Sequence, residues 1–248
     1  MLTEDRFQMI LDILKEKKSV TVTDLTKQLD TSESTIRRDL LALDKKGLLH
    51  RVHGGATTIV STHYEREEAV SQKTSKNVHE KQEIAKYCAS LIEEEDFVYI
   101  DAGTTTELMI DYLTIKQATY VTNAVTHALK LMKKGFHVCL IGGELKEVTE
   151  AIVGSVAIEN LEKYNFTKGF FGANGIDLKT GITTPDVNEA MIKKVAKNHC
   201  LQSYILADHS KFAKITAITF CQMTDTIIIT DKIEDKNYKK LKNIKEVL

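Results

Sequence analysis

Two adjacent arginines, Arg37 and Arg38, follow Ser34 and Thr35 in the first part of the chain. On a helix through these residues, Ser34 and Arg38 point away from the apolar face, and Thr35 and Arg37 lie on its flanks. An arginine can bridge guanine O6 and N7 or bind a phosphate, and hydroxyl groups reach phosphates or base edges. These residue types in this order predict a helix that enters the major groove of double-stranded DNA.

A short glycine-rich stretch, residues 48–55, follows this helix and predicts a hairpin that would form a wing. Arg51 and His53 in that hairpin are placed to contact DNA phosphates. A pair of arginines also occurs on ordinary solvated helix faces, so the pair alone does not decide between the two interpretations. The order of the elements around it favours DNA binding.

A second group of chemically capable residues occupies positions 101–106, directly after an apolar stretch typical of a strand. Asp101 comes first, and Gly103 lets the backbone approach a ligand. The hydroxyl groups of Thr104, Thr105 and Thr106, together with free N–H groups at a helix start, suit a phosphate. Threonine-rich helix starts are also ordinary caps, so the loop alone leaves both interpretations open.

Polar residues follow four other predicted strands in the same way. Each such loop alone is what a plain turn uses. Five of them in one sheet, with cations and hydrogen-bond acceptors among them, predict a cleft for a polar ligand. The candidates from these four loops are Asn123, Gly142, Gly143, Asn174, Asp177 and Lys211.

The elements that must position the first group are short and alternate in type. Apolar residues from Phe7 to Leu14 follow a helical period, and Val20 and Val22 alternate with polar residues as in a strand. A second helix begins near Thr23, and Ser32 is a good N-cap for a third. Helix, strand, helix, turn, helix and hairpin predict a winged helix-turn-helix over residues 1–57, followed by a linker over 58–78.

The elements that must position the second group alternate between strands and helices from residue 79 to 248. Strands are predicted at 97–100, 120–122, 138–141, 169–172, 204–207 and 226–230, and helices at 107–113, 124–133, 152–163 and 187–199. This alternation predicts an open, mainly parallel α/β sheet of Rossmann-like type. Ligands bind such sheets beyond the carboxyl ends of the strands.

Bulk composition limits the classes of function. The chain has 248 residues, 42 % hydrophobic and 28 % charged, and a net charge of -1, so DNA binding must rest on local pattern. The four cysteines are far apart in the sequence and lie among apolar residues, which predicts reduced thiols, no metal site and a cytoplasmic location. No apolar run approaches the length of a membrane span, so no membrane partner is expected.

Both halves resemble the DeoR family of bacterial sugar-metabolism repressors. In the first half the resemblance lies in S-E-S-T-I-R-R-D-L (32–40) and G-L-L-H-R-V-H-G-G-A (47–56). In the second half it lies in D-A-G-T-T-T (101–106), V-T-N-A (121–124), I-G-G-E (141–144), G-A-N-G-I-D (172–177), G-I-T-T (181–184) and L-A-D-H-S-K-F (206–212), with N-E-A (188–190) and Lys193. Within the family the chain most resembles repressors of fructose operons.

The resemblance implies a function for each half. Residues 1–57 would bind operator DNA, and residues 79–248 would form a sensor domain similar to ribose-5-phosphate isomerase, with a phosphorylated sugar in the 103–106 loop. It implies fructose 1-phosphate as the effector. No cofactor is expected, and a homodimer or homotetramer is expected because tethered winged helices usually need a dimer to reach two half-sites. It also implies that further side chains shape the pocket, namely Asp101, Asn123, Asp177, Glu189, Lys193 and Lys211.

Two alternatives are compatible with parts of the sequence. A sugar-phosphate isomerase with an accessory N-terminal domain could use Asp101, Asp177, Glu189 and Lys193 for acid–base chemistry. Binding alone explains these groups, and no pair of carboxylates has a spacing that demands catalysis, so we expect no enzyme. An adaptor acting through protein partners would be the third possibility, but the sequence has no long heptad run and no low-complexity tail.

Overall fold

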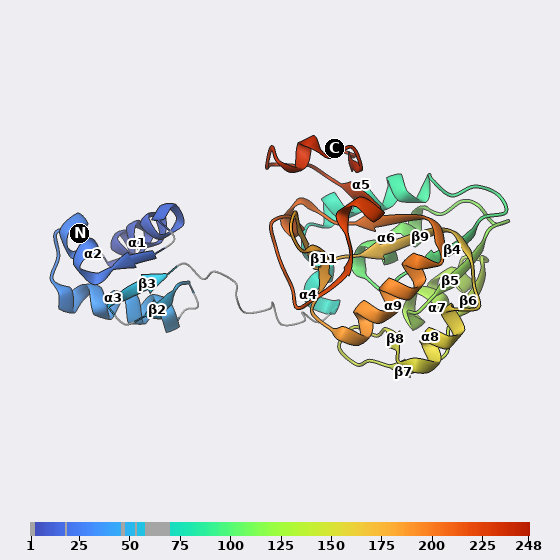
Figure 1. Cartoon of the computed structure of the whole chain (residues 1–248), viewed down its shortest axis with the longest axis horizontal. Coiled ribbons are helices and arrows are strands. Elements are labelled where there is room, and N and C mark those ends of the chain that lie inside the picture. The colour runs from blue at the N-terminus through green and yellow to red at the C-terminus, as the bar shows by residue number, and fades with distance from the viewer. Residues whose placement is uncertain (1–2, 18, 46–47, 53, 58–69) are drawn as a thin grey trace. The chain divides into compact units, whose positions relative to one another are not determined.

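The chain divides into two compact units, Met1–His63 and Tyr64–Leu248 (Figure 1). In this computed structural model the described residues are 3–17, 19–45, 48–52, 54–57 and 70–248. The predicted linker 58–78 therefore lies partly outside them. Its described end begins at residue 70 with helix α4 (Val70–Thr74), which packs against α6 (Thr104–Tyr112) and so forms part of the second unit.

The first unit is a winged helix-turn-helix, as the sequence predicts. Its sheet is antiparallel with the strand order β1-β3-β2, and its core is made by apolar side chains from all three helices, among them Ile10, Leu25, Ile36, Leu40 and Leu43. The elements in chain order are α1 (Thr3–Lys17), β1 (Ser19–Thr21), α2 (Val22–Gln28), α3 (Glu33–Lys45), β2 (His50–Val52) and β3 (Gly55–Thr57).

Local chemistry explains where α2 and α3 begin. The Thr21 hydroxyl accepts a hydrogen bond from the Asp24 backbone N–H at 3.0 Å, and the Ser32 hydroxyl accepts one from Thr35 at 3.3 Å. These are the N-cap contacts expected of Thr and Ser. Strand β3 runs so close to β1 that a Cβ on Gly55 would lie 2.1 Å from the Val20 carbonyl oxygen. Glycine is therefore required where the hairpin joins the helical part.

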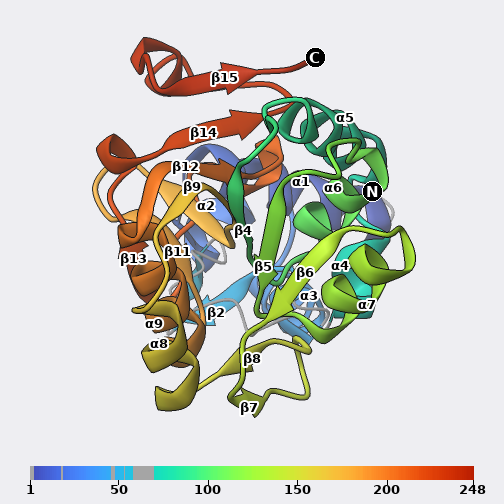
Figure 2. The ribbon, with the colours of Figure 1, turned by 90° about the vertical axis from the view of Figure 1, so that its right-hand side faces the viewer.

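The second unit is built on a sheet of seven parallel strands in the order β15-β14-β12-β9-β4-β5-β6 (Figure 2). Successive side chains of β4 face opposite sides, so Val98 and Ile100 pack with one layer of helices and Tyr99 with the other. The strands are β4 (Phe97–Ile100), β5 (Thr119–Thr122), β6 (His137–Leu140), β9 (Phe166–Gly172), β12 (Cys200–Leu206), β14 (Ile227–Thr230) and β15 (Ile244–Glu246).

Helices cover both faces of this sheet. Helices α5 (Val78–Ala89), α6 (Thr104–Tyr112) and α7 (Val125–Lys133) lie on one face, where Ile84, Met109 and Leu131 are fully buried. Helices α8 (Ser155–Leu161) and α9 (Val187–Asn198) lie on the other. Both layers are visible in Figure 2, with α5, α6 and α7 to the right and α8 and α9 to the left.

Short elements that the sequence did not predict complete the unit. A hairpin of β7 (Glu144–Leu145) and β8 (Ile152–Val153) precedes α8, so the predicted helix start at residue 152 was wrong. A three-stranded antiparallel sheet contains β10 (Gly175–Asp177), β11 (Gly181–Thr184) and β13 (Ile218–Cys221). Single 3₁₀ turns lie at His209–Lys211, Met223–Asp225 and Tyr238–Lys240.

The order of the parallel strands reverses between β4 and β9. From β4 the chain moves outward to β5 and β6, then returns to β9 and moves the other way to β12, β14 and β15. Crossovers therefore leave a crevice at the carboxyl ends of β4 and β9, which is where open α/β sheets bind ligands. Among the described residues, no helix is long and apolar enough to cross a membrane.

Candidate functional site

The exposed face of α3 carries the residues predicted to contact DNA. Ser34, Arg37 and Arg38 are exposed, and the Thr35 hydroxyl, half-buried, shares a hydrogen bond of 2.9 Å with Ser32. Arg37 forms an exposed ion pair with Glu33 at 3.2 Å, and the Arg38 Nε donates to the Ser34 carbonyl oxygen at 3.3 Å. Exposed pairs of this kind contribute little, so DNA phosphates or bases can replace them.

A shallow depression joins α3 to the wing. It is lined by Val22, Arg37, Leu40, Arg51, Val52, Gly54 and Gly55. The Arg51 backbone N–H donates to the Asp44 side chain at 3.1 Å, which holds the wing against the end of α3. The structure thus brings Arg51 and Arg37 to one surface, while His53 lies outside the described residues.

A buried ion pair between α1 and α3 was not predicted. The Arg6 guanidinium donates to both carboxylate oxygens of Asp39, at 2.5 and 3.0 Å, and this hydrogen bond raises the pKa of Arg6. Asp39 follows Arg38 in the sequence, yet it lies on the side of α3 that carries Ile36 and Leu40. The position of Asp39 on the apolar side of the predicted helix was the sequence signal that could have indicated a buried ion pair. The pair removes a carboxylate from the arginine-bearing face.

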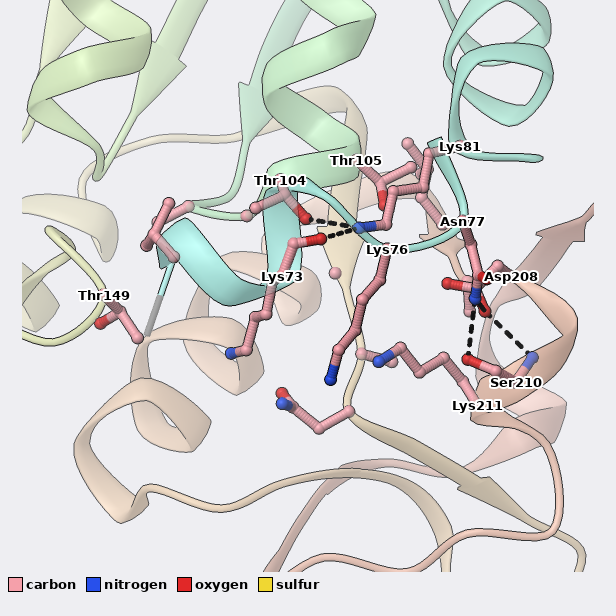
Figure 3. A pocket seen from close by; sticks show the side chains of 18 of the residues that line it. Lys73, Lys76, Asn77, Lys81, Thr104, Thr105, Thr149, Asp208, Ser210 and Lys211 are labelled. Atoms are coloured by element: carbon pink, nitrogen blue, oxygen red, sulfur yellow. Dashed lines mark hydrogen bonds between the residues drawn. The ribbon is translucent and has the colours of Figure 1, made fainter. Parts of the chain in front are cut away.

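The second unit has a pocket at the strand-order reversal between β4 and β9 (Figure 3). Its wall is formed by the loops after β4, β9 and β12, by the α4–α5 and β7–β8 turns, and by residues of α4, α5, α6 and α9. The lining residues are Val70, Lys73, Lys76, Asn77, Lys81, Ala102, Gly103, Thr104, Thr105, Thr149, Gly172, Ala173, Asn174, Glu189, Lys193, Leu206, Ala207, Asp208, Ser210 and Lys211.

The loop after β4 presents Gly103, Thr104 and Thr105 to this pocket, whereas Asn123 and Thr106 shape the loop from behind. The Asn123 side-chain oxygen accepts a hydrogen bond from the Ala102 N–H at 2.8 Å. The Thr106 hydroxyl donates to the carbonyl oxygens of Asp101 and Gly103, at 2.6 and 2.8 Å. Neither Asn123 nor Thr106 lines the pocket. Both side chains instead form hydrogen bonds that hold the loop backbone, and this loop lines the pocket.

A histidine that the sequence analysis missed, His127, lies beneath the same loop. Its side chain is buried and hydrogen-bonds to the Gly103 backbone, while its Nδ1 has no hydrogen-bond partner among the described residues. Burial, reinforced by the charge of Lys130, lowers the pKa of His127 to about 3. The imidazole is therefore neutral near pH 7 and supports the loop without adding charge.

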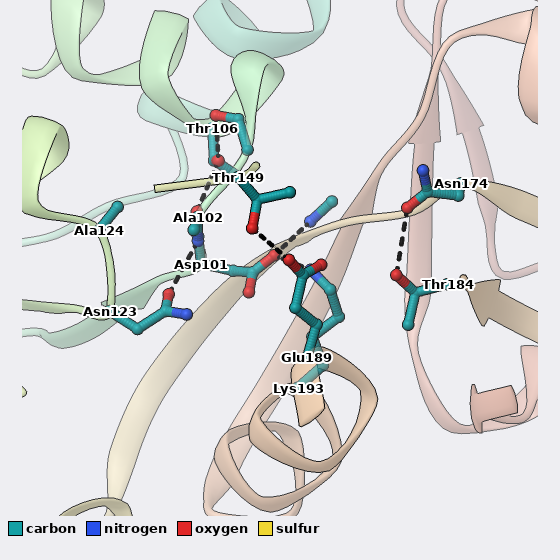
Figure 4. Close-up of polar contacts among 12 residues, drawn as sticks. Asp101, Ala102, Thr106, Asn123, Ala124, Thr149, Asn174, Thr184, Glu189 and Lys193 are labelled. Atoms are coloured by element: carbon teal, nitrogen blue, oxygen red, sulfur yellow. Dashed lines mark hydrogen bonds and ion pairs between the residues drawn. The ribbon is translucent and has the colours of Figure 1, made fainter. Parts of the chain in front are cut away.

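The floor of the pocket contains the buried ion pair of Asp101 and Lys193 (Figure 4). The same Asp101 oxygen accepts a hydrogen bond from the Gly172 N–H at 3.1 Å, which joins the ends of β4 and β9. Burial raises the pKa of Asp101, and the Lys193 ammonium opposes this. Lys193 reaches the pocket surface and Asp101 does not, so Asp101 acts by holding Lys193 in place.

Glu189 and Asn174 place hydrogen-bond acceptors on the wall. Glu189 accepts a hydrogen bond from the Thr149 hydroxyl, and its carboxylate lies 3.3 Å from the Lys146 ammonium. Asn174 accepts one from the Thr184 hydroxyl at 3.2 Å, which fixes the orientation of its amide. Thr149 comes from the turn between β7 and β8, so that hairpin contributes directly to the pocket (Figure 4).

Cations dominate the pocket wall. Five lysines line it, against the two acids Glu189 and Asp208. Lys193 and Lys211 were predicted, whereas Lys73, Lys76 and Lys81 were missed because they precede the first predicted strand of the sheet. This excess of positive charge suits an anionic ligand, and the hydroxyls of Thr104 and Thr105 beside it suit a phosphate.

Three predicted ligand residues lie away from the pocket. Gly142 and Gly143 form the turn between β6 and β7, where Gly143 has a φ of +150° and a Cβ would lie 2.7 Å from the Val153 carbonyl oxygen. Asp177 accepts hydrogen bonds from the Lys179 and Thr180 N–H groups, at 2.9 and 3.0 Å. All three residues therefore shape turns, which is the other function that the sequence allowed for such loops.

Among the described residues, Glu80, His209 and Asp231 form a group whose side-chain types could ligate a metal, with donor atoms within 4.8 Å of one another. His209 already contacts Asp231 twice, through its ring Nδ1 and its backbone N–H, each at 2.6 Å. These contacts anchor the 3₁₀ turn that carries Lys211 to the end of β14. The group is therefore explained by its structural role.

Comparisons with known proteins agree with this division into two parts. Residues 6–62 match the model of the DeoR-like helix-turn-helix domain, and residues 76–232 match that of the DeoR C-terminal sensor domain. An uncharacterized HTH-type transcriptional regulator named FruR from Bacillus subtilis is 41 % identical over 239 residues, covering 96 % of this chain and 94 % of the relative.

Two further comparisons concern a staphylococcal repressor and a solved enzyme structure. The lactose phosphotransferase system repressor of Staphylococcus aureus is 33 % identical over 252 residues, covering all of both chains. Ribose 5-phosphate isomerase A from Methanocaldococcus jannaschii covers 56 % of each chain at 17 % identity with a TM-score of 0.40, a level that carries no functional argument. The two domain matches and the full-length relatives show that this chain belongs to the DeoR family of transcriptional regulators.

Proposed function

We propose that the protein represses a sugar-utilisation operon and that a phosphorylated sugar in the second unit controls its binding to operator DNA. The observation that carries the proposal is the lysine-rich pocket at the strand-order reversal, on the same chain as a winged helix with exposed arginines. The name of the full-length staphylococcal relative supports a role in sugar uptake or use. The proposed site of action is the cytoplasm.

The chemistry of the pocket favours a phosphorylated sugar over a neutral one. Lysines and the threonine hydroxyls of the α6 start suit the phosphate, while Glu189 and Asn174 can accept hydrogen bonds from sugar hydroxyls. We propose fructose 1-phosphate as the effector, on the likeness to repressors of fructose operons and to the relative named FruR. Binding to DNA as a homodimer or homotetramer would let two heads reach two half-sites.

The enzyme alternative loses support from the geometry of the carboxylates. Asp101 is paired with Lys193, and Glu189 is held by Thr149, so both are engaged in positioning the wall. The two matching family models describe a DNA-binding domain and a sensor domain, which indicates a regulator and not an enzyme. The pocket therefore binds its ligand without needing to convert it.

The test is operator binding by the full-length protein with and without candidate effectors. A gel shift on the upstream region of the protein's own operon is expected to change midpoint when fructose 1-phosphate is added, and unphosphorylated fructose should have no effect. A panel of other sugar phosphates extends the test to the effector class. If none of them changes operator affinity, the proposed control by a sugar phosphate is wrong.

Replacing one pocket hydroxyl tests the site itself. Thr104→Val keeps the shape of the side chain and removes a hydroxyl that points into the pocket, so we expect effector binding to weaken by about 1 kcal/mol or more. Thr114→Val, at an exposed position that does not line the pocket, is the matched control. Calorimetry with the same sugar phosphate measures both, and equal affinities would contradict the assigned site.

A further inference from the structure

Helix α4 and the turn that follows it bring two lysines, Lys73 and Lys76, into the wall of the sensor pocket. We propose that Lys73 and Lys76 bind the anionic group of the effector, and that α4 thereby carries the state of the pocket to the chain segment that leads to the DNA-binding head. The inference rests on the proposed function and adds the residues and the element through which it would be regulated.

Lysines from several elements point into the pocket (Figure 3). Figure 3 shows the side chains of Lys73, Lys76 and Lys211 extending toward the same part of the pocket. Lys211 belongs to the turn after β12, so the cations approach from different walls. Like charges around one cavity repel each other, and an anion placed among them is stabilised by all of them.

Lys81 connects α4 to the phosphate-type loop. The Lys81 ammonium, which is buried, donates to the Lys73 carbonyl oxygen at 2.5 Å and to the Thr104 hydroxyl at 3.2 Å. One cation therefore joins the end of α4 to the start of α6, where the phosphate is proposed to bind. A ligand that contacts Thr104 and Lys81 acts directly on the group that anchors α4.

Asn77 lies at the joint between α4 and α5. Asn77 has a left-handed backbone conformation, with a φ of 49°, and its side-chain amide donates to Asp208 at 2.8 Å and to Ser210 at 3.3 Å. This fixes the joint to the loop after β12 on the opposite wall. Helix α4 is thus held between two loops that both line the pocket. A bound ligand would therefore contact the groups that hold α4 on both sides.

Helix α4 is also close in sequence to the DNA-binding head. Residue 70, at the start of α4, is the first described residue after the head, whose last strand ends at Thr57. No other described element of the second unit is nearer to the head in sequence. A ligand shifts an equilibrium only through contacts that differ between two states, and contacts to α4 place such a difference at the start of the connection.

A double substitution tests the binding part of the proposal. Lys73→Gln with Lys76→Gln removes two charges from the pocket, and Lys239→Gln with Lys240→Gln removes two from an exposed turn that does not line it. With fructose 1-phosphate and the sugar-phosphate panel as probes, calorimetry should show at least about tenfold weaker binding for the first variant only. Equal affinity of the two variants would overturn the proposal.

Hydrogen exchange of the wild-type protein tests the regulatory part and needs no variant. The backbone amides of residues 70–77 should exchange at least about tenfold more slowly when the probe saturates the pocket. Unchanged exchange there, despite binding, would overturn the role of α4. If wild-type protein binds no member of the panel, the proposed function fails first and this inference with it. That result is recognisable because the control variant fails as well.

Discussion

Among the described residues, Arg37 and Arg38 make only weak surface contacts, which leaves both side chains available to DNA. Arg37→Ala or Arg38→Ala should each weaken operator binding by about 1–3 kcal/mol if the side chain contacts a base. A side chain that contacts only phosphate should instead lower the affinity for all sequences and reduce the salt dependence. Fluorescence anisotropy on operator and scrambled DNA at several salt concentrations separates the two roles.

The control for these arginines is Lys239→Ala, which removes one positive charge from an exposed turn of the second unit. It should leave operator affinity unchanged at every salt concentration. Unaltered binding by both arginine variants would mean that α3 is not the recognition helix. Loss of binding by the control as well would mean that general charge, and not α3, determines the affinity.

His127 makes the stability of the second unit depend on pH. Its folded-state pKa of about 3 is below the value near 6.5 expected in the unfolded chain. Between these values the unfolded chain binds a proton that the folded chain does not, so stability falls as the pH falls. From pH 7.5 to 5.5 this histidine should lower the free energy of unfolding by about 1.4 kcal/mol.

Urea unfolding at the two pH values measures this effect. His127→Leu should lack this part of the pH dependence, whatever its overall stability, because no imidazole is left to protonate. His79→Gln, at an exposed position on α5, should retain the wild-type difference. If His127→Leu loses as much stability as the wild type on acidification, His127 is not the group that titrates.

At the scale of elements, the Arg6–Asp39 pair fixes α1 against α3 inside the head. Removing one partner of a buried pair leaves the other charge uncompensated, so Asp39→Ala should destabilise the head by about 3 kcal/mol. Glu33→Ala breaks only the exposed pair with Arg37 and should cost less than about 1 kcal/mol. Urea dependence of amide exchange in α1 and α3 measures both, and similar costs would contradict a structural role for the buried pair.

Elements whose pattern is local were predictable from the sequence. Strand β4 and helix α9 follow directly from an apolar run and a helical period, and both begin where the sequence predicts. The hairpin of β7 and β8 could not be predicted, because two-residue strands have no period and exist through pairing. Helix α4 was assigned to a linker because it too is short and shows no apolar period. Its position depends on contacts with parts of the chain that are distant in sequence.

The same distinction holds for the pocket. Gly103, Thr104 and Lys211 lie in the loops that follow the ends of β4 and β12, so the general rule for parallel sheets places them at the crevice. The rule does not say which way a side chain turns, and Asn123 and Thr106 turn inward to hold the loop. Lys73 and Lys76 reach the pocket from before the first parallel strand, and no local pattern connects them to it.

At the scale of the whole molecule, each unit has its own apolar core. The core of the head draws on residues 7–56 alone, and the two cores of the second unit draw on residues 84–247. Stability gained in one core is therefore not automatically gained in the other. The proposed control of DNA binding therefore needs a path from the second unit to the head, and along the chain that path runs from residue 70 to residue 57.

This separation predicts where an effector should stabilise the protein. A ligand at 100 times its dissociation constant raises the free energy of unfolding of the unit that binds it by about 2.7 kcal/mol. We expect slower amide exchange in β4, β9 and β12 by roughly that free energy, and little change in the core of α1, α2 and α3. Hydrogen exchange of the full-length protein with fructose 1-phosphate and with fructose measures both units in one experiment. Equal protection of the head would mean that the two units unfold together, and that the effector acts on DNA binding through shared stability and not through α4.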